Sequence, residues 1–144
     1  MAILRQAEGK ERFLGRLPYG SDLLGEITKI STERGIRLAW FQGLGAVQRV
    51  CASFYDQKAQ EYKPVTIDRP LEITSLVGNV SVKGAAPFVH AHITLADDEG
   101  RAFGGHLAPG TIVFACEFTM EILDGPPFQR TFDETTGLFL WALK

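Results

Sequence analysis

The chain has 144 residues, of which 45% are hydrophobic and 22% charged, so residues 1–144 are expected to form a single globular domain. Its 15 basic and 17 acidic side chains give a formal net charge of −2, which argues against a free-standing nucleic-acid-binding protein, because such proteins usually carry a basic excess. No apolar run approaches the ~20 residues that cross a bilayer, the first residues lack the apolar stretch of a secretion signal, and two cysteines make no disulfide framework. We therefore expect a soluble, cytoplasmic protein that does not contact membranes.

The N-terminal part of the sequence predicts a hairpin followed by a helix. Residues 2–18, AILRQAEGKERFLGRLP, contain two extended runs with Gly9 in the turn between them. The next segment has the spacing of an amphipathic helix, with Ser21 or Asp22 as its N-cap and Gly35 as its end.

After this helix the pattern becomes extended and stays so. β-branched and aromatic residues dominate, and turn residues separate the runs. Because strands follow strands and only one strong helix is visible, the sequence predicts an α+β fold, with a strongly bent, mostly antiparallel, barrel-like sheet that carries one main helix. The predicted strands span residues 36–45, 46–56, 70–84, 87–96, 101–107, 111–123 and 136–143, the first two separated at Gly43–Gly45.

All three histidines of the chain fall in one predicted hairpin, PFVHAHITLADDEGRAFGGHL. Residues two apart on a strand share a face, so His90 and His92 point to the same side. A three-residue loop at 98–100, with glycine in its third place, puts His106 directly across from His92. Gly104, which carries no side chain, would leave space beside them. A two-residue loop, or a bulge at the double glycine, would shift this register by one.

Three converging histidines are a ligand set for Zn²⁺ or another divalent transition metal. Zinc binds neutral imidazole at about 2.0–2.1 Å, and three protein ligands leave a fourth position for water or a ligand. The alternative is three independent polar histidines on a solvated sheet face. The third histidine in register favours the metal site.

Two acidic residues within predicted strands are candidates for a supporting role. Glu72 and Glu117 could each orient a metal-bound water or a ligand histidine, or could simply face solvent, as most acidic residues do. Glu72 is the preferred catalytic candidate, because Leu71 and Ile73 flank it. No cofactor-binding motif is predicted, since GLGAVQ lacks the third glycine of a dinucleotide fingerprint and precedes a strand.

Taken together, these segments resemble the plant and prokaryote conserved (PPC) domain family. The likeness covers about residues 10–123, and its most specific part is the strand–turn–strand that ends in GGHL. The matching stretches are LPYGSDLLGEI, ERGIRLAWFQGLGAVQRV, PLEITSLVGNVS, VHAHITLADDEGRAFGGHL and CEFTMEI.

The resemblance implies a compact α+β domain that associates as a homotrimer. It also implies that His90, His92 and His106 match the metal-binding positions of prokaryotic members. Plant members place the domain after an AT-hook that enters the DNA minor groove, and this sequence has no such element, so we expect weak DNA binding at most. The fold is also similar to that of α-acetolactate decarboxylase, a zinc enzyme, but a likeness of fold alone does not establish a reaction.

These observations support two functions. The first is a metal-binding, trimeric ligand-binding or regulatory module, whose partner is a small carboxylate or carbonyl compound. The alternative is a small zinc-dependent lyase or hydrolase that acts on a compound of the same class. The apolar run GLFLWAL near the C-terminus has apolar residues on both faces of its predicted strand, which is expected of a strand in a subunit interface.

Overall fold

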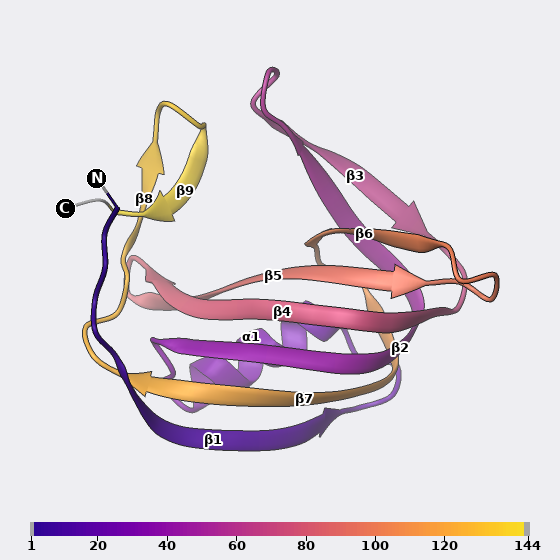
Figure 1. Ribbon diagram of the computed structural model, residues 1–144, viewed down its shortest axis with the longest axis horizontal. Coiled ribbons are helices and arrows are strands. Elements are labelled where there is room, and N and C mark those ends of the chain that lie inside the picture. The colour runs from indigo at the N-terminus through magenta and orange to yellow at the C-terminus, as the bar shows by residue number, and fades with distance from the viewer. Residues whose placement is uncertain (1, 143–144) are drawn as a thin grey trace.

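A computed structural model describes residues 2–142, which form nine strands and one helix (Figure 1). The helix α1 spans Leu23–Glu33. The strands are β1 (Glu8–Leu17), β2 (Ala39–Asp56), β3 (Glu61–Ile67), β4 (Leu71–Lys83), β5 (Ala86–Ala96), β6 (Ala102–Leu107), β7 (Ile112–Asp124), β8 (Arg130–Asp133) and β9 (Leu138–Trp141).

Seven of these strands form one sheet in the order β1-β7-β2-β4-β5-β6, with β3 paired to the far half of β2. All of the strand pairings are antiparallel, and β8 and β9 form a separate hairpin. The α+β class with one main helix is therefore confirmed. The barrel-like shape is wrong: β1 pairs only with β7 and remains an edge, and β6 reaches back to β2 through just two residue pairs.

The helix covers one face of the sheet (Figure 1). Asp22 is its N-cap, since the carboxylate accepts a hydrogen bond from the Gly25 N–H at 2.7 Å, and Gly35 follows its end with a φ of 62°. Leu23 and Ile27 are fully buried against the sheet, so this face holds the hydrophobic core. Within residues 2–142, no helix is long and apolar enough to span a membrane.

Two sequence predictions for the N-terminal half are wrong. Within residues 2–142 no N-terminal hairpin forms: β1 is a single strand, and Gly9 lies at a shift in its register with β7. The charged residues around Gly9 suit an exposed edge strand, where charges prevent further pairing. The two strands predicted about Gly43–Gly45 are one continuous strand, β2, which absorbs the glycines as a bulge against β4.

Two further strands were not predicted, and one was predicted in part. The sequence of β3 contains Pro64, which is tolerated because β3 pairs only with β2. The hairpin partner β8 was also missed. The predicted terminal strand is present as β9, but Leu143, which was placed in it, lies outside the described residues.

Candidate metal centre

The hairpin of β5 and β6 has the predicted register. His92 pairs with His106, and the Asp97 N–H donates to the Arg101 carbonyl at 3.1 Å, which leaves residues 98–100 as the loop. Gly100 has a φ of 76°, as the third position of this loop requires. The buried Asp97 carboxylate fixes the turn by accepting hydrogen bonds from the backbone N–H groups of Glu99 and Arg101.

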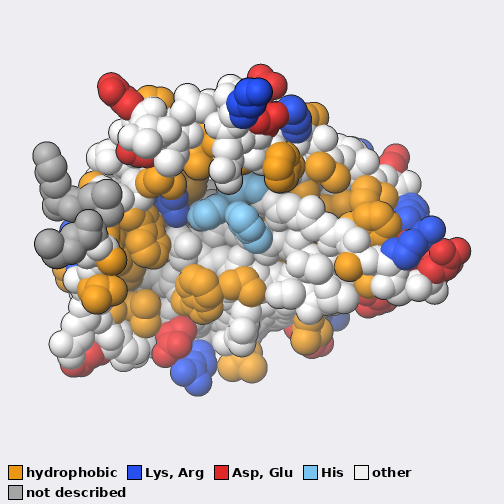
Figure 2. Space-filling model, turned by 45° about the horizontal axis from the view of Figure 1, so that its top comes forward, with side chains coloured by type: hydrophobic (Ala, Val, Ile, Leu, Met, Phe, Trp, Pro, Cys, Tyr) orange, Lys and Arg blue, Asp and Glu red, His pale blue; other side chains and the backbone are white. Residues whose placement is uncertain are grey.

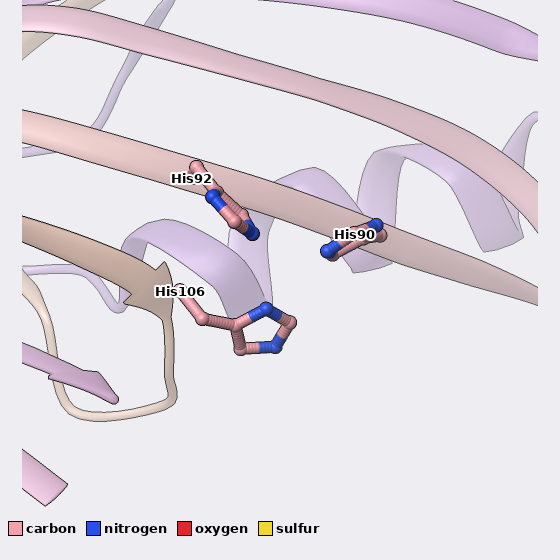
Figure 3. Close-up of side chains that lie close together, drawn as sticks. All are labelled: His90, His92 and His106. Atoms are coloured by element: carbon pink, nitrogen blue, oxygen red, sulfur yellow. The ribbon is translucent and has the colours of Figure 1, made fainter. Parts of the chain in front are cut away.

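The three histidines lie on the sheet face opposite the helix. Val89, Ala91 and Ile93 alternate with them along β5 and are buried in the core, as a period of two requires. One ring nitrogen from each histidine lies within 4.8 Å of the other two. Figure 3 shows the rings of His90 and His92 on β5 pointing toward that of His106 on β6. The sequence-based prediction that the three imidazoles converge is confirmed.

The surroundings favour the neutral form of His90 and His106. Burial, followed by the influence of His106, Arg130 and His92, lowers the pKa of His90 to about 4. Burial, His92 and Arg130 also lower the pKa of His106. A neutral imidazole keeps the lone pair that a metal ion needs.

The histidines form the floor of a cavity of about 610 Å³. Figure 2 shows them at the bottom of a hollow, with hydrophobic side chains around its rim. One wall comes from the β2–β3 hairpin, including Tyr55 and Tyr62, and the other from the β8–β9 hairpin, including Leu138 and Leu140. Both hairpins rise on the same side of the sheet (Figure 1). The imidazoles are therefore accessible to a small molecule within walls of mixed apolar and polar character.

The double glycine of β6 has a different role from the predicted one. A Cβ at Gly104 would lie 2.7 Å from the Ile93 carbonyl oxygen, and one at Gly105 would lie 2.8 Å from the Ser53 carbonyl oxygen. Both distances are too short for a side chain. The glycines thus allow the backbone of β6 to approach β5 and β2 closely, and this approach positions His106; Gly104 does not border the cavity.

Neither acidic candidate is brought to the histidines. Glu72 is exposed and pairs with Ala96, four residues along β5 from His92, which corresponds to about 13 Å along the strand. Glu117 is also exposed and borders a separate hollow near Gln42. No acidic side chain among the described residues lines the histidine cavity.

Sequence reasoning missed two polar residues of the cavity. Arg130, at the start of β8, places a guanidinium nitrogen 3.4 Å from His90 Nδ1. The Tyr62 ring centroid on β3 lies 5.1 Å from that of His106, and burial, with Tyr55, raises the pKa of Tyr62. The run RTFDETTGLFLW does carry a hairpin pattern, which would have predicted β8, but no local signal places this hairpin over the histidines.

The fold and the site together define a class: a small α+β domain with an open cluster of three histidines that could hold a metal ion. The Plants and Prokaryotes Conserved (PCC) domain profile matches residues 4–124, and the chain belongs to this family. This confirms the predicted membership in the PPC family.

Solved structures agree with this assignment. A metal-containing protein from Archaeoglobus fulgidus is 43% identical, with a TM-score of 0.93 over 98% of this chain and 99% of that one. A PPC protein from Pyrococcus horikoshii is 33% identical, with a TM-score of 0.92 over 98% and 97% of the two chains. A protein from Ralstonia eutropha, described as a candidate DNA-binding protein, is 26% identical, with a TM-score of 0.81 over 91% and 90% of the two chains.

Other matches are less informative about function. The bifunctional protein GlmU of Synechococcus is 30% identical over 127 residues, which make up 85% of this chain but only 18% of that protein. The chain thus spans less than a fifth of the curated relatives that it matches. A Staphylococcus aureus protein similar to α-acetolactate decarboxylase also matches, but its TM-score of 0.49 supports no functional argument.

Proposed function

We propose that the chain binds a divalent transition metal, zinc in the first instance, through His90, His92 and His106, and that the metal takes a small carboxylate or carbonyl ligand. The observation that carries this proposal is the convergence of three imidazoles, with nitrogens within 4.8 Å, on the floor of an open cavity. A relative that is 43% identical is described as metal-containing, which supports the same conclusion.

The chemistry of the donor set fits zinc better than a hard cation. The cluster consists of imidazoles without a carboxylate among the described residues, and imidazole suits Zn²⁺, Cu²⁺ and Ni²⁺, whereas Mg²⁺ and Ca²⁺ prefer oxygen. A bound metal of this kind supplies Lewis acidity at a position left open by the three protein ligands. The residues around it determine which molecule reaches that position.

We expect the protein to act as a homotrimer, as the family resemblance implies. The exposed apolar side chains Leu14, 84% exposed, and Leu44, 58% exposed, border a common hollow on the sheet. Burial of such a surface between subunits would remove apolar area from water. The apolar surface available for association therefore includes Leu14 and Leu44 as well as the partly exposed strand β9.

A small zinc-dependent lyase or hydrolase is the second candidate. It is favoured by a cavity large enough for a small substrate, with the polar groups of Tyr62 and Arg130 in its walls. Glu72 lies outside the cavity and is poorly placed to act as the general base. Tyr62, whose ring lies beside that of His106, is the better placed proton-handling group.

The description of the Ralstonia eutropha relative motivates a role in DNA binding. With 15 basic against 17 acidic residues, this chain offers few phosphate contacts unless several copies combine theirs. We expect weak, salt-sensitive binding without sequence preference. Nanomolar, sequence-selective binding at physiological salt would make DNA the primary partner.

Elemental analysis of protein purified without a histidine tag tests the metal site. We expect up to about one zinc-like ion per chain, as a single three-histidine site allows. Small carboxylates such as acetate should raise the melting temperature of the metal-loaded protein and leave that of the metal-free protein unchanged, because only a state that binds the ligand is stabilised. Absence of metal after incubation with zinc would refute the proposal.

A further inference from the structure

Arg130 is a buried cation whose described partners are all neutral. The residue is 7% exposed. Its Nε donates to Ser81 Oγ at 2.8 Å, Nη1 to the Phe139 carbonyl at 3.0 Å, and Nη2 to Asn79 Oδ1 at 3.2 Å. Within residues 2–142, no carboxylate lies within 4.0 Å of its guanidinium. Because charged side chains are rarely buried unless paired, this guanidinium lacks the anion that would normally accompany it.

The guanidinium also borders the histidine cavity. It lies over the Phe88 ring, with 4.8 Å between its central carbon and the ring centroid, and both residues line the cavity. Arginine has five N–H donors, of which three have the neutral acceptors named above. A fourth, on Nη2, is 3.4 Å from His90 Nδ1. At least one donor is therefore left without a described partner.

Metal binding would free a second donor. A neutral imidazole has one nitrogen that carries hydrogen and one that carries a lone pair. If the lone pair of His90 binds a metal, Nδ1 is either a metal ligand or an N–H group, and in both cases it no longer accepts a hydrogen bond from Arg130. The loaded site would thus present unsatisfied Arg130 N–H groups beside the open metal position.

We propose that Arg130 is the anion-recognising residue of the cavity, and that the ligand is a small carboxylate held by Arg130 as it occupies the open metal position. This inference rests on the proposed function, since it names the residue and the charge that select the ligand of that same site. Carboxylates are the natural partners of a guanidinium, whose planar N–H donors match their oxygens. The apolar walls at Phe88 and Leu138 favour a carboxylate with an apolar body.

A purely structural role is the competing explanation, because Arg130 also ties the β8–β9 hairpin to β4 through Ser81 and Asn79. With that role alone, any preference for an anionic ligand would come from the metal, and it would survive the loss of the Arg130 charge. Benzoate and benzamide have nearly the same shape, and only benzoate carries a negative charge. Comparing their affinities in the wild type and in Arg130 variants separates the two explanations. We therefore propose calorimetric titration of both compounds into zinc-loaded and metal-free protein.

The variants are R130Q, which removes the charge, and R130K, which keeps it without the guanidinium geometry. R12Q is the matched control, since Arg12 is exposed and lies outside the cavity. We expect zinc-loaded wild-type protein to bind benzoate at least tenfold more tightly than benzamide. R130Q should lose at least this tenfold preference, R130K should retain part of it, and R12Q should match the wild type. Metal-free protein should bind benzoate at least tenfold more weakly, because it lacks the metal position and because His90 still occupies one Arg130 donor.

Zinc content, measured on the same samples, distinguishes failure of the proposed metal site from failure of the proposed role of Arg130. Failure of the wild-type protein to bind zinc would refute the proposed function and this inference with it. Normal zinc content with equal affinities for benzoate and benzamide would refute only the inference, and so would an unchanged benzoate affinity in R130Q. If R130Q does not fold, R130K decides, because a benzoate preference equal to that of the wild type would show that the guanidinium does not hold the carboxylate.

Discussion

Replacing His92 with alanine should remove most of the metal affinity with little effect on the fold. His92 is the exposed member of the cluster and makes no described hydrogen bond, so its loss should change the stability of the metal-free protein by less than about 0.5 kcal/mol. Apparent zinc-binding free energies of four-ligand sites are about 10–16 kcal/mol, which corresponds to about 3 kcal/mol per ligand. Since 1.4 kcal/mol is a factor of ten, H92A should raise the zinc Kd by about 100-fold or more.

The assay is a competition titration of zinc against a chromophoric chelator, together with urea unfolding of the metal-free protein. Thr94→Ala is the matched control, because Thr94 is exposed, lies two residues along the same strand and points to the same face. The control should bind zinc as tightly as the wild type. Wild-type zinc affinity in H92A would show that the three histidines do not form the site.

Three further outcomes are expected. Burial, with His106 and Arg130, lowers the pKa of His90 from 6.5 to about 4, so between these pH values the unfolded chain binds a proton that the folded chain does not. The urea midpoint of the metal-free protein should therefore fall on acidification through this window, and less steeply in H90Q; equal slopes in the two proteins would contradict the assigned pKa. G105A should lose about 1–3 kcal/mol of unfolding free energy, because its Cβ would lie 2.8 Å from the Ser53 carbonyl oxygen, and an unchanged urea midpoint would refute this close approach. Light scattering at micromolar concentration should give the mass of a trimer, whereas a monomer mass would exclude the proposed assembly.

The convergence of the three histidines was predictable because its geometry is local. One hairpin carries all three histidines, and a hairpin's register follows from its loop length and from the position of its glycine. Asp97 reinforces that register with hydrogen bonds inside the loop itself. The alternation of the histidines with Val89, Ala91 and Ile93 was equally predictable, because one side of the strand must face the core.

Other features depended on long-range pairing and could not be predicted in this way. Whether β1 forms its own hairpin or pairs with β7 depends on the sequence of β7, which lies about a hundred residues further along the chain. Two nearby glycines such as Gly43 and Gly45 are equally compatible with a turn between strands and with a bulge inside one strand. Only the pairing of β2 with β4 selects the bulge. The closure predicted for the sheet failed for a similar reason, since the contact of β6 with β2 ends after two residue pairs.

The histidine cavity likewise combines residues that are close in sequence with residues that are distant, and the two sets have different expected roles. The candidate metal ligands come from one segment, whereas the groups that would contact a bound molecule come from the β2–β3 and β8–β9 hairpins, which are distant in sequence. Arg130 connects the two sets, because it lies within 3.4 Å of His90 and its Nη1 donates to the backbone of β9. Substitutions in the β8–β9 hairpin would therefore change which molecule is bound while leaving the three imidazoles in place. Metal affinity and ligand selectivity should accordingly be separable by mutation in this protein.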